Sequence, residues 1–243
     1  MIYELYYWPG IQGRGEFVRL ALEQAGTHYV DVAQDVGGEG TAIEKLERVL
    51  DRCGSPYPPY ALPVLRAGDL VIAQTANILL YLGPRHGLAP ADESGRLWAH
   101  QLQLTIMDWV SEIHDTHHPL GPTLHYEDQK AAARKRTTEF LRHRLPKFLG
   151  YFETVLERKP TGGGHLVGRA LTYVDLSLFQ AVDGLRYAFP RAMKKNGETY
   201  PLVSALHDRV AKGDRIAAYL ASGRRVAFNE NGIFRHYPEL DAS

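Results

Sequence analysis

The segment Leu62-Pro63-Val64-Leu65, followed by Gln74-Thr75, indicates the fold more clearly than any other stretch of the chain. It places a proline at the entrance to a strand and a polar pair at the start of a helix. Near the N-terminus, Tyr6-Tyr7-Trp8-Pro9 closes another strand, just before a helix that opens near Arg14. In an open α/β sheet, ligands gather at the carboxyl ends of strands and at helix N-termini. The segments therefore predict a small site with a phenol, an exposed strand backbone and an anion-favouring helix start, suited to a peptide-like ligand that bears carboxylates.

Composition argues against several kinds of partner and compartment. The chain has 243 residues and a formal net charge of +0 at pH 7, so no overall basic field attracts nucleic acid. No apolar run approaches the ~20 residues of a membrane span, and the start resembles no signal peptide. The single cysteine, Cys53, cannot form an intramolecular disulfide. We therefore expect a cytoplasmic protein with neither a nucleic-acid nor a membrane partner.

Strand and helix signals alternate up to about residue 84. The expected elements are a strand over 2–7, a helix from near Arg14 to Gly26, a strand over 28–32, a helix over 41–52, a hairpin over 62–73 and a helix from about 74 that stops before Pro84. This alternation predicts a mixed α/β domain over residues 1–84.

Strand signals disappear after Pro90. Long helices are expected from Leu97 to about 115 and from about 127 to 158, the second with a kink at Pro146. Thr172 and Asp175 predict a capping box at the start of a buried helix. Two shorter helices are expected around 202–210 and 216–221. The second half is therefore predicted to be an all-helical domain over residues 92–243.

These motifs, in this order, resemble the cytosolic glutathione transferases from Tyr3 to about Gly232. Tyr7-Trp8 followed by Gly13-Arg14 is most similar to the tyrosine-type classes, mu and pi. The resemblance implies a thioredoxin-like first domain in which Pro63 is cis. One extra residue near Gly10, and a segment between 37 and 60 that aligns with neither class, depart from the family pattern.

The resemblance implies that a tyrosine hydroxyl ionises the thiol of bound glutathione. A free thiol has a pKa of ~8.5, and a hydroxyl that hydrogen-bonds to sulfur favours the thiolate. Tyr7 is the expected catalytic residue, although in isolation it could equally be a packed strand residue. Tyr6 points to the opposite face of the strand, but a shift caused by the insertion at Gly10 would exchange the two roles.

The same resemblance implies a set of glutathione-binding residues, each with a plainer structural alternative. Leu62 would bind through its backbone, Gln74 and Thr75 could merely cap a helix, and Asp108, the counterpart of a family aspartate that acts across the dimer, could be simply solvated. Trp8 could be buried, Arg14 could pair with Glu16, and Arg48 and Arg52 rival Lys45 for the glycine carboxylate. The full set is Trp8, Arg14, Lys45, Leu62, Pro63, Gln74, Thr75 and Asp108.

The wall of the electrophile pocket is less determined. Its candidates, each of which could equally serve in packing between the domains, are Ile11, Ile113, His117, Phe234 and Tyr237.

The histidines and the cysteine give no sign of other chemistry. His114, His117 and His118, with His125 nearby, match no zinc signature, so no metal is expected. Cys53 follows a helix, and no cysteine lies between Tyr7 and Arg14, which argues against catalysis by a protein thiol.

The predicted function is conjugation of glutathione, as co-substrate, to a hydrophobic electrophile by a homodimer. Two alternatives stay open: a non-catalytic protein that binds glutathione or apolar ligands, and a glutathione-dependent isomerase or peroxidase that uses the same thiolate.

Overall fold

The computed structural model of the chain describes residues 2–35, 39–52, 57–159 and 164–241. Four strands form one sheet in the order β2-β1-β3-β4. β1 pairs in parallel with β2 and antiparallel with β3, and β3 pairs antiparallel with β4. The strands span Tyr3–Tyr6 (β1), Tyr29–Asp31 (β2), Val64–Ala67 (β3) and Leu70–Ala73 (β4).

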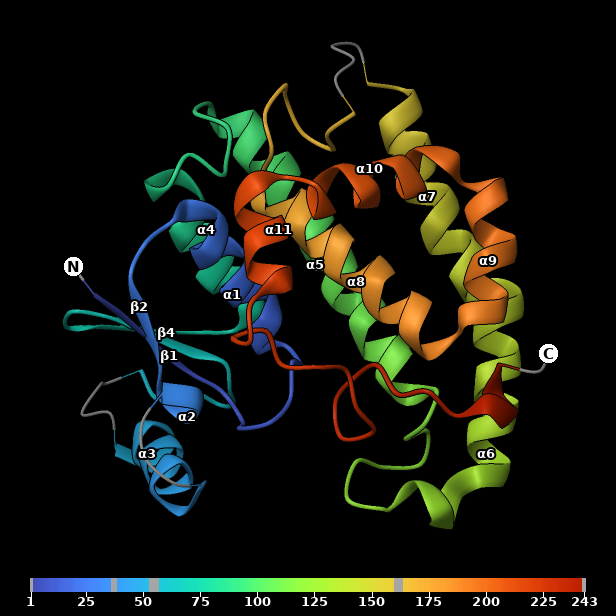
Figure 1. The fold of residues 1–243 in the computed structure, drawn as a ribbon, viewed down its shortest axis with the longest axis horizontal. Coiled ribbons are helices and arrows are strands. Elements are labelled where there is room, and N and C mark those ends of the chain that lie inside the picture. Colours follow the sequence, from blue (N-terminus) through green and yellow to red (C-terminus); the bar gives the residue numbers. More distant parts are fainter. Residues whose placement is uncertain (1, 36–38, 53–56, 160–163, 242–243) are drawn as a thin grey trace.

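Helices cover both faces of this sheet (Figure 1). On one face, Tyr3 and Leu5 pack with residues of α1 (Gly15–Ala25) and α4 (Thr75–Arg85). On the other face, Tyr6 packs with Leu46 of α3 (Glu39–Arg52), which follows the short helix α2 (Val32–Asp35). The alternation along β1 is the period of two that an extended strand imposes on its side chains.

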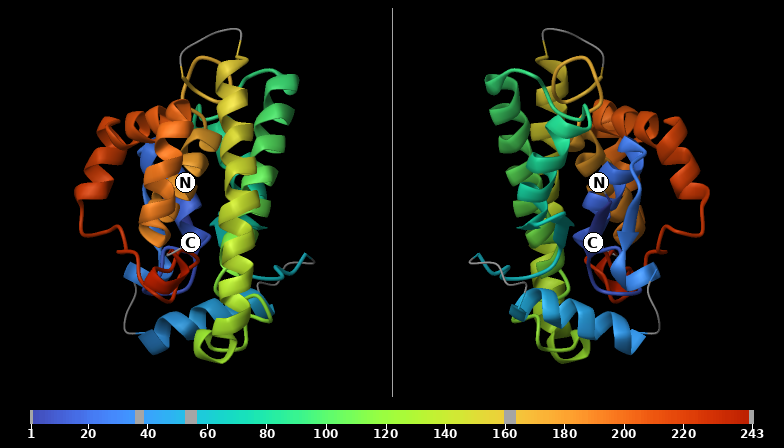
Figure 2. Two further views of the ribbon diagram at one scale, coloured as in Figure 1. Left: turned by 90° about the vertical axis from the view of Figure 1, so that its right-hand side faces the viewer. Right: turned by 90° about the vertical axis from the view of Figure 1, so that its left-hand side faces the viewer.

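The rest of the chain is helical. Figure 2 shows α5 and the α6–α7 column standing side by side, with the later helices beside them. The buried helix α8 contacts α1, α5, α9 and α10, which explains why it is apolar on most sides. The elements are α5 (Glu93–Asp115), α6 (Tyr126–Glu139), η1 (Phe140–Arg144), α7 (Leu145–Glu157), α8 (Tyr173–Ala188), α9 (Pro190–Thr199), α10 (Pro201–Ala211), α11 (Asp214–Ala221) and η2 (Pro238–Leu240).

Several local predictions are confirmed. The Leu62–Pro63 peptide bond is cis, and Gly26 ends α1 with a φ of 63°. The capping box at Thr172 and Asp175 is present. The fold as a whole is the predicted one, a thioredoxin-like sheet domain followed by an all-helical part.

Other local predictions are wrong in detail. α4 continues through Pro84 to Arg85: the proline removes one backbone hydrogen bond, but the N–H of His86 still bonds to the carbonyls of Leu82 and Gly83. The irregularity in the long helix is a π-helical turn at Phe140–Arg144, just before Pro146 rather than at it. α9 was not predicted, and Cys53 lies outside the described residues.

No helix in the described part of the chain combines the length and the apolar character needed to cross a bilayer.

Candidate active site

Tyr7 lies directly after β1, where the chain turns toward the N-terminus of α1. Its hydroxyl oxygen accepts a hydrogen bond of 2.7 Å from the backbone N–H of Arg14, the residue that precedes α1. Because this oxygen already has a donor, its own proton is available to a further acceptor. The hydroxyl is thus held at the positive end of a helix dipole.

Two glycines allow this close approach. A Cβ atom on Gly13 would lie 2.1 Å from the Tyr7 hydroxyl oxygen, and one on Gly15 would lie 2.6 Å from Cγ of the ring. Gly13 also has a φ of 47°, in the left-handed region that favours glycine. The loop before α1 therefore fixes the phenol by direct contact.

The surroundings of Tyr7 keep its hydroxyl protonated. Burial raises the pKa of Tyr7, and this outweighs the Arg14 N–H and the positive charges of Arg14 and Arg19, which lower it. At neutral pH the group is therefore a neutral hydrogen-bond donor and not a base.

Tyr6 points the other way. Its hydroxyl donates to a carboxylate oxygen of Glu4 at 3.0 Å, and Glu4 in turn pairs with Arg66. Of the two adjacent phenols, only that of Tyr7 faces the start of α1.

A second group of predicted glutathione-binding residues lies where the N-termini of α1 and α4 come together. Thr75, the first residue of α4, donates through Oγ1 to the carbonyl of Arg14 at 3.3 Å. Gln74 has a φ of 71°, which is unusual for a residue with a side chain and is typical of functional sites. Two adjoining helix N-termini favour an anion between them.

A cavity of about 350 Å³ opens at this junction. Arg14, Gln74, Thr75 and Asp108 line it together, so four of the predicted binding residues share one space. Arg14 reaches across to Ser111 of α5, donating to its hydroxyl at 2.9 Å, whereas Glu16 pairs with other arginines. The cavity thus presents cationic, anionic and helix N-terminal groups side by side, which suits a zwitterionic ligand end.

The other predicted binding residues lie elsewhere. Lys45 lines a separate cavity of about 530 Å³, on the α3 side of the sheet, with Arg48 and Tyr6. The side chain of Arg52 lies outside the described residues. Trp8 is 43% exposed and is therefore not buried under the helices.

The predicted electrophile wall is mostly packed interior. Ile113, His117 and Phe234 are at most 2% exposed, and Phe234 also lines a narrow crevice beside Gln12 and Gly13. Tyr237 stacks on Tyr126 with ring centroids 3.8 Å apart. Ile11 packs at the edge of the cluster that contains Tyr6 and Tyr7. Of the five residues, the crevice beside Gln12 and Gly13 is lined by Phe234 alone.

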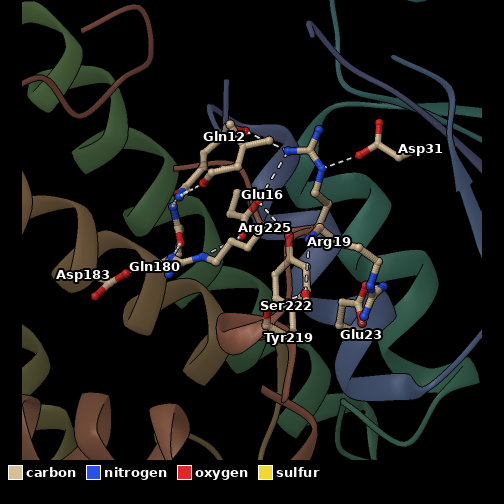
Figure 3. A network of polar contacts seen from close by, with 12 residues as sticks. Gln12, Glu16, Arg19, Glu23, Asp31, Gln180, Asp183, Tyr219, Ser222 and Arg225 are labelled. Carbon is tan, nitrogen blue, oxygen red and sulfur yellow. Dashed lines mark hydrogen bonds and ion pairs between the residues drawn. The ribbon is translucent and has the colours of Figure 1, made fainter. Parts of the chain in front are cut away.

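A buried polar network behind Tyr7 was not predicted (Figure 3). Arg19 pairs with Asp31 and with Glu16, and Glu16 also accepts from Arg225 at 3.2 Å. Burial lowers the pKa of Arg19, but the carboxylates of Asp31 and Glu16 raise it by more than burial lowers it, so the guanidinium stays charged. In the sequence, the one sign of this network is that charged residues lie on the apolar face of the predicted first helix.

This network holds the loop that positions Tyr7. The side chain of Gln12 donates to the carbonyl of Val226 at 2.6 Å and accepts from Gln180 at 2.7 Å. Arg19 donates to the Gln12 carbonyl at 3.3 Å. The turn that supplies the Arg14 N–H is therefore anchored to α8 and to the segment after α11.

The fold and this arrangement define the class of protein, and comparisons with known proteins agree. Residues 114–223 match the family model described as "Glutathione S-transferase, C-terminal domain". A glutathione S-transferase of Plasmodium falciparum is 25% identical over 229 residues, which cover 92% of this chain and 97% of the relative. Glutathione S-transferase P 1 of Xenopus laevis is 26% identical, with 92% and 93% covered. In fold and in these matches, the chain is similar to the glutathione transferases over most of its length.

Solved structures share the fold at lower sequence identity. Prostaglandin synthase D of Nilaparvata lugens superposes with a TM-score of 0.70 at 21% identity, covering 93% of this chain and 100% of that one. A glutathione S-transferase of the hookworm Necator americanus, described as monomeric, has a TM-score of 0.68 at 18% identity, with 94% and 100% covered.

Proposed function

We propose that this chain joins the sulfur of glutathione to hydrophobic electrophiles, with the hydroxyl of Tyr7 stabilising the thiolate. The thiol proton leaves to solvent, Tyr7 keeps its own proton and donates a hydrogen bond, and the sulfur forms the new bond to the electrophile. Positioning and electrostatic stabilisation carry such a reaction.

The observation that supports this most strongly is the contact between the Arg14 N–H and the Tyr7 hydroxyl. It orients the oxygen while leaving the O–H free to donate. Lowering a thiol pKa by two units needs ~2.7 kcal/mol. One hydrogen bond to a charged sulfur contributes ~1.5–3 kcal/mol, and the nearby helix N-terminus adds to it.

We assign the γ-glutamyl end of glutathione to the cavity at the start of α4. Its carboxylate would lie at the helix N-terminus near Gln74 and Thr75, and its amino group near the carboxylate of Asp108. The backbone of Leu62, beside the cis bond at Pro63, would pair with the peptide. For the glycyl end of glutathione, Lys45 and Trp8 are still the predicted partners. The residues expected to line the electrophile pocket likewise stay a prediction.

The decisive experiment compares Tyr7→Phe with Tyr6→Phe. Without the Tyr7 hydroxyl, the pKa of the bound thiol should rise by about one to two units, because a hydrogen bond of ~1.5–3 kcal/mol to the thiolate is lost. The pH–rate profile should move to higher pH, and turnover near pH 7 should fall by about 10- to 100-fold. Ultraviolet titration of the bound thiolate and steady-state kinetics measure both effects.

Tyr6→Phe serves as the matched control, because its hydroxyl donates to Glu4 on the other face of the sheet. It should leave the profile in place. An unshifted profile in Tyr7→Phe, or an equal shift in both variants, would refute the proposal. Calorimetry tests the binding-protein alternative: glutathione binding without thiolate formation would favour it. Thiolate titration cannot separate conjugation from isomerisation or peroxide reduction, because all three reactions use the same thiolate. Isomerase and peroxidase assays are therefore needed to distinguish them.

We further propose a homodimer, since family sites are completed across a subunit interface. Leu97 and Leu104 lie seven residues apart on α5 and are 65% and 49% exposed, so they share an outward apolar face. Light scattering should give twice the chain mass, and Leu97→Glu should weaken association because it places a charge in the interface. Leu202→Glu on α10, 39% exposed, is the control. A monomer at micromolar concentration would contradict the proposal.

A further inference from the structure

Three histidines gather where α5 ends. His114 lies in the last turn of α5, and His117 and His118 follow it directly. One ring nitrogen from each lies within 4.8 Å of the others, the one such group of histidine, cysteine and carboxylate side chains found in the described residues. The rings are also close, with centroids 4.7 to 5.1 Å apart.

The hydrogen bonding of His117 orients it as a ligand. Its Nε2 lies 2.8 Å from the carbonyl oxygen of Ile233, so Nε2 carries the proton and Nδ1 carries the lone pair. A backbone carbonyl that receives the other ring N–H is the usual outer partner of a histidine that binds a metal. That lone pair now accepts a hydrogen bond of 2.5 Å from the Nδ1–H of His118, so a metal ion would replace this bond and His118 would give up its Nδ1 proton.

We propose that His114, His117 and His118 form a binding site for a divalent transition-metal ion such as Zn²⁺. Imidazole nitrogen is a preferred ligand of zinc, copper and nickel. Tetrahedral zinc with bonds of about 2.0–2.1 Å places its nitrogen ligands about 3.4 Å apart. Modest ring rotations, which open the His117–His118 pair and draw in His114, reach this spacing. Three protein ligands leave the fourth position to water.

The sequence spacing gave no reason to expect this site. His-x-x-His-His matches no zinc signature. Here α5 ends at Asp115, and the backbone N–H groups of His117 and His118 both donate to the carbonyl of His114, so one further turn brings the three rings together. The carbonyl of Ile233, from the far end of the chain, then fixes the orientation of one ring.

Nearby charges limit the affinity. Arg14 and Arg235 act electrostatically on His114, and Arg235 and His125 act on His118. The guanidinium of Arg235 donates to the carbonyls of Gly232 and Asn231, and that of Arg14 donates to Ser111. These positive groups oppose a cation, so binding should be weaker than at a structural zinc site with four ligands.

The test uses the untagged full chain after removal of metal with a chelator. Titration with Co²⁺, followed by visible absorption, and with Zn²⁺, followed by calorimetry, should show one ion per chain and the spectrum of tetrahedral cobalt. Bound Zn²⁺ should also raise the melting temperature, because the ion binds the folded state.

Variants locate the ion. His114→Gln should weaken metal binding by at least about 10-fold, since even the loss of a residue that hydrogen-bonds to a metal ligand has an effect of that size. His114 suits the test because it is only partly buried. His118→Gln should act alike. His143→Gln, whose side chain is 55% exposed on η1, and Cys53→Ser, which removes the single thiol, should bind as the parent does.

Circular dichroism and glutathione calorimetry check that each variant is folded. Absence of saturable binding to the parent chain would overturn the proposal. So would unchanged affinity in His114→Gln and His118→Gln, which would place the ion elsewhere.

Discussion

At the scale of single residues, the site depends on glycines as much as on the side chains that line it. The ring of Tyr7 passes against Gly13 and Gly15 so closely that neither position has room for a Cβ atom. Gln74 adopts a backbone conformation that residues with side chains rarely take, at a cost of about 1–3 kcal/mol. This strain beside the start of α4 motivates the ligand contact that we propose for Gln74.

Gly13→Ala should reduce turnover to nearly the level of Tyr7→Phe. The new methyl group would occupy the position of the Tyr7 hydroxyl, 2.1 Å away, and would push the phenol off the Arg14 N–H. The thiol pKa, measured by ultraviolet titration, should therefore rise.

Gly10→Ala is the matched control for this change. Gly10 has a φ of 70°, as strained for alanine as that of Gly13, but no atom lies within 4 Å of its would-be Cβ. It should lower stability by about 1 kcal/mol and leave the thiol pKa unchanged. Equal kinetic effects in the two variants would mean that backbone strain, and not the collision with Tyr7, is responsible.

At the scale of elements, the N-terminus of α8 is the best-determined point in the helical part. Asp175 is fully buried and accepts hydrogen bonds from the N–H of Leu166 at 2.7 Å and from the N–H and hydroxyl of Thr172 at 2.7 and 2.9 Å. Its carboxylate therefore joins the loop before α8 to the helix itself. α8 lies at the centre of the helices, so this cap stabilises more than one turn.

Asp175→Ala should lower the free energy of unfolding by about 3–5 kcal/mol, because three buried donors lose their acceptor. Urea unfolding followed by circular dichroism measures this. Asp92→Ala removes a cap of the same chemistry at the exposed start of α5, where the carboxylate accepts from the N–H of Gly95 at 2.7 Å. It should cost much less, because the N–H of Gly95 can then bond to water. A similar loss in both variants would show that burial of the carboxylate does not set the cost of removing it.

At the scale of the whole molecule, the segment after α11 connects the two halves. Its Arg225 bonds to Glu16 of α1 and, at 2.8 Å, to Asp183 of α8. Asn229 then donates to the carbonyl of Gly10, and the segment ends with Asp241 bonded to the start of α9. Figure 1 shows this segment running from the sheet side across to α6.

Arg225→Met should lower the free energy of unfolding by about 3 kcal/mol, because the buried Glu16 and the partly buried Asp183 each lose an arginine partner. It should also raise the thiol pKa, because the Gln12–Arg14 turn loses a neighbour that fixes it. Thermal unfolding and ultraviolet titration provide the two measurements.

The adjacent Arg224 supplies the control. It pairs with Glu23 of α1, but its side chain is 61% exposed. Arg224→Met should therefore cost less than about 1 kcal/mol and leave the thiol pKa in place. Equal loss of stability in Arg225→Met and Arg224→Met would contradict the idea that the buried network joins the two halves of the molecule.

Much of the fold was predictable because it depends on local interactions. The strand period of β1, the left-handed glycine after α1 and the capping box of α8 each follow from residues a few positions apart. α9 was missed because its sequence is short and mostly polar, with Met193 as its buried residue. The π-helical turn was placed wrongly because Pro146 was the only visible breaker.

By itself, the sequence determined most strands and helices in their order, since turn chemistry and periodicity act between near neighbours. It also carried the family resemblance, which implied the cis proline. Only the tertiary structure separated Tyr6 from Tyr7, brought Asp108 to Gln74, placed Lys45 in another cavity and assembled the histidine cluster and the network around Glu16. These contacts join residues far apart in the chain, and their partners are chosen by how helices pack, which no local pattern encodes.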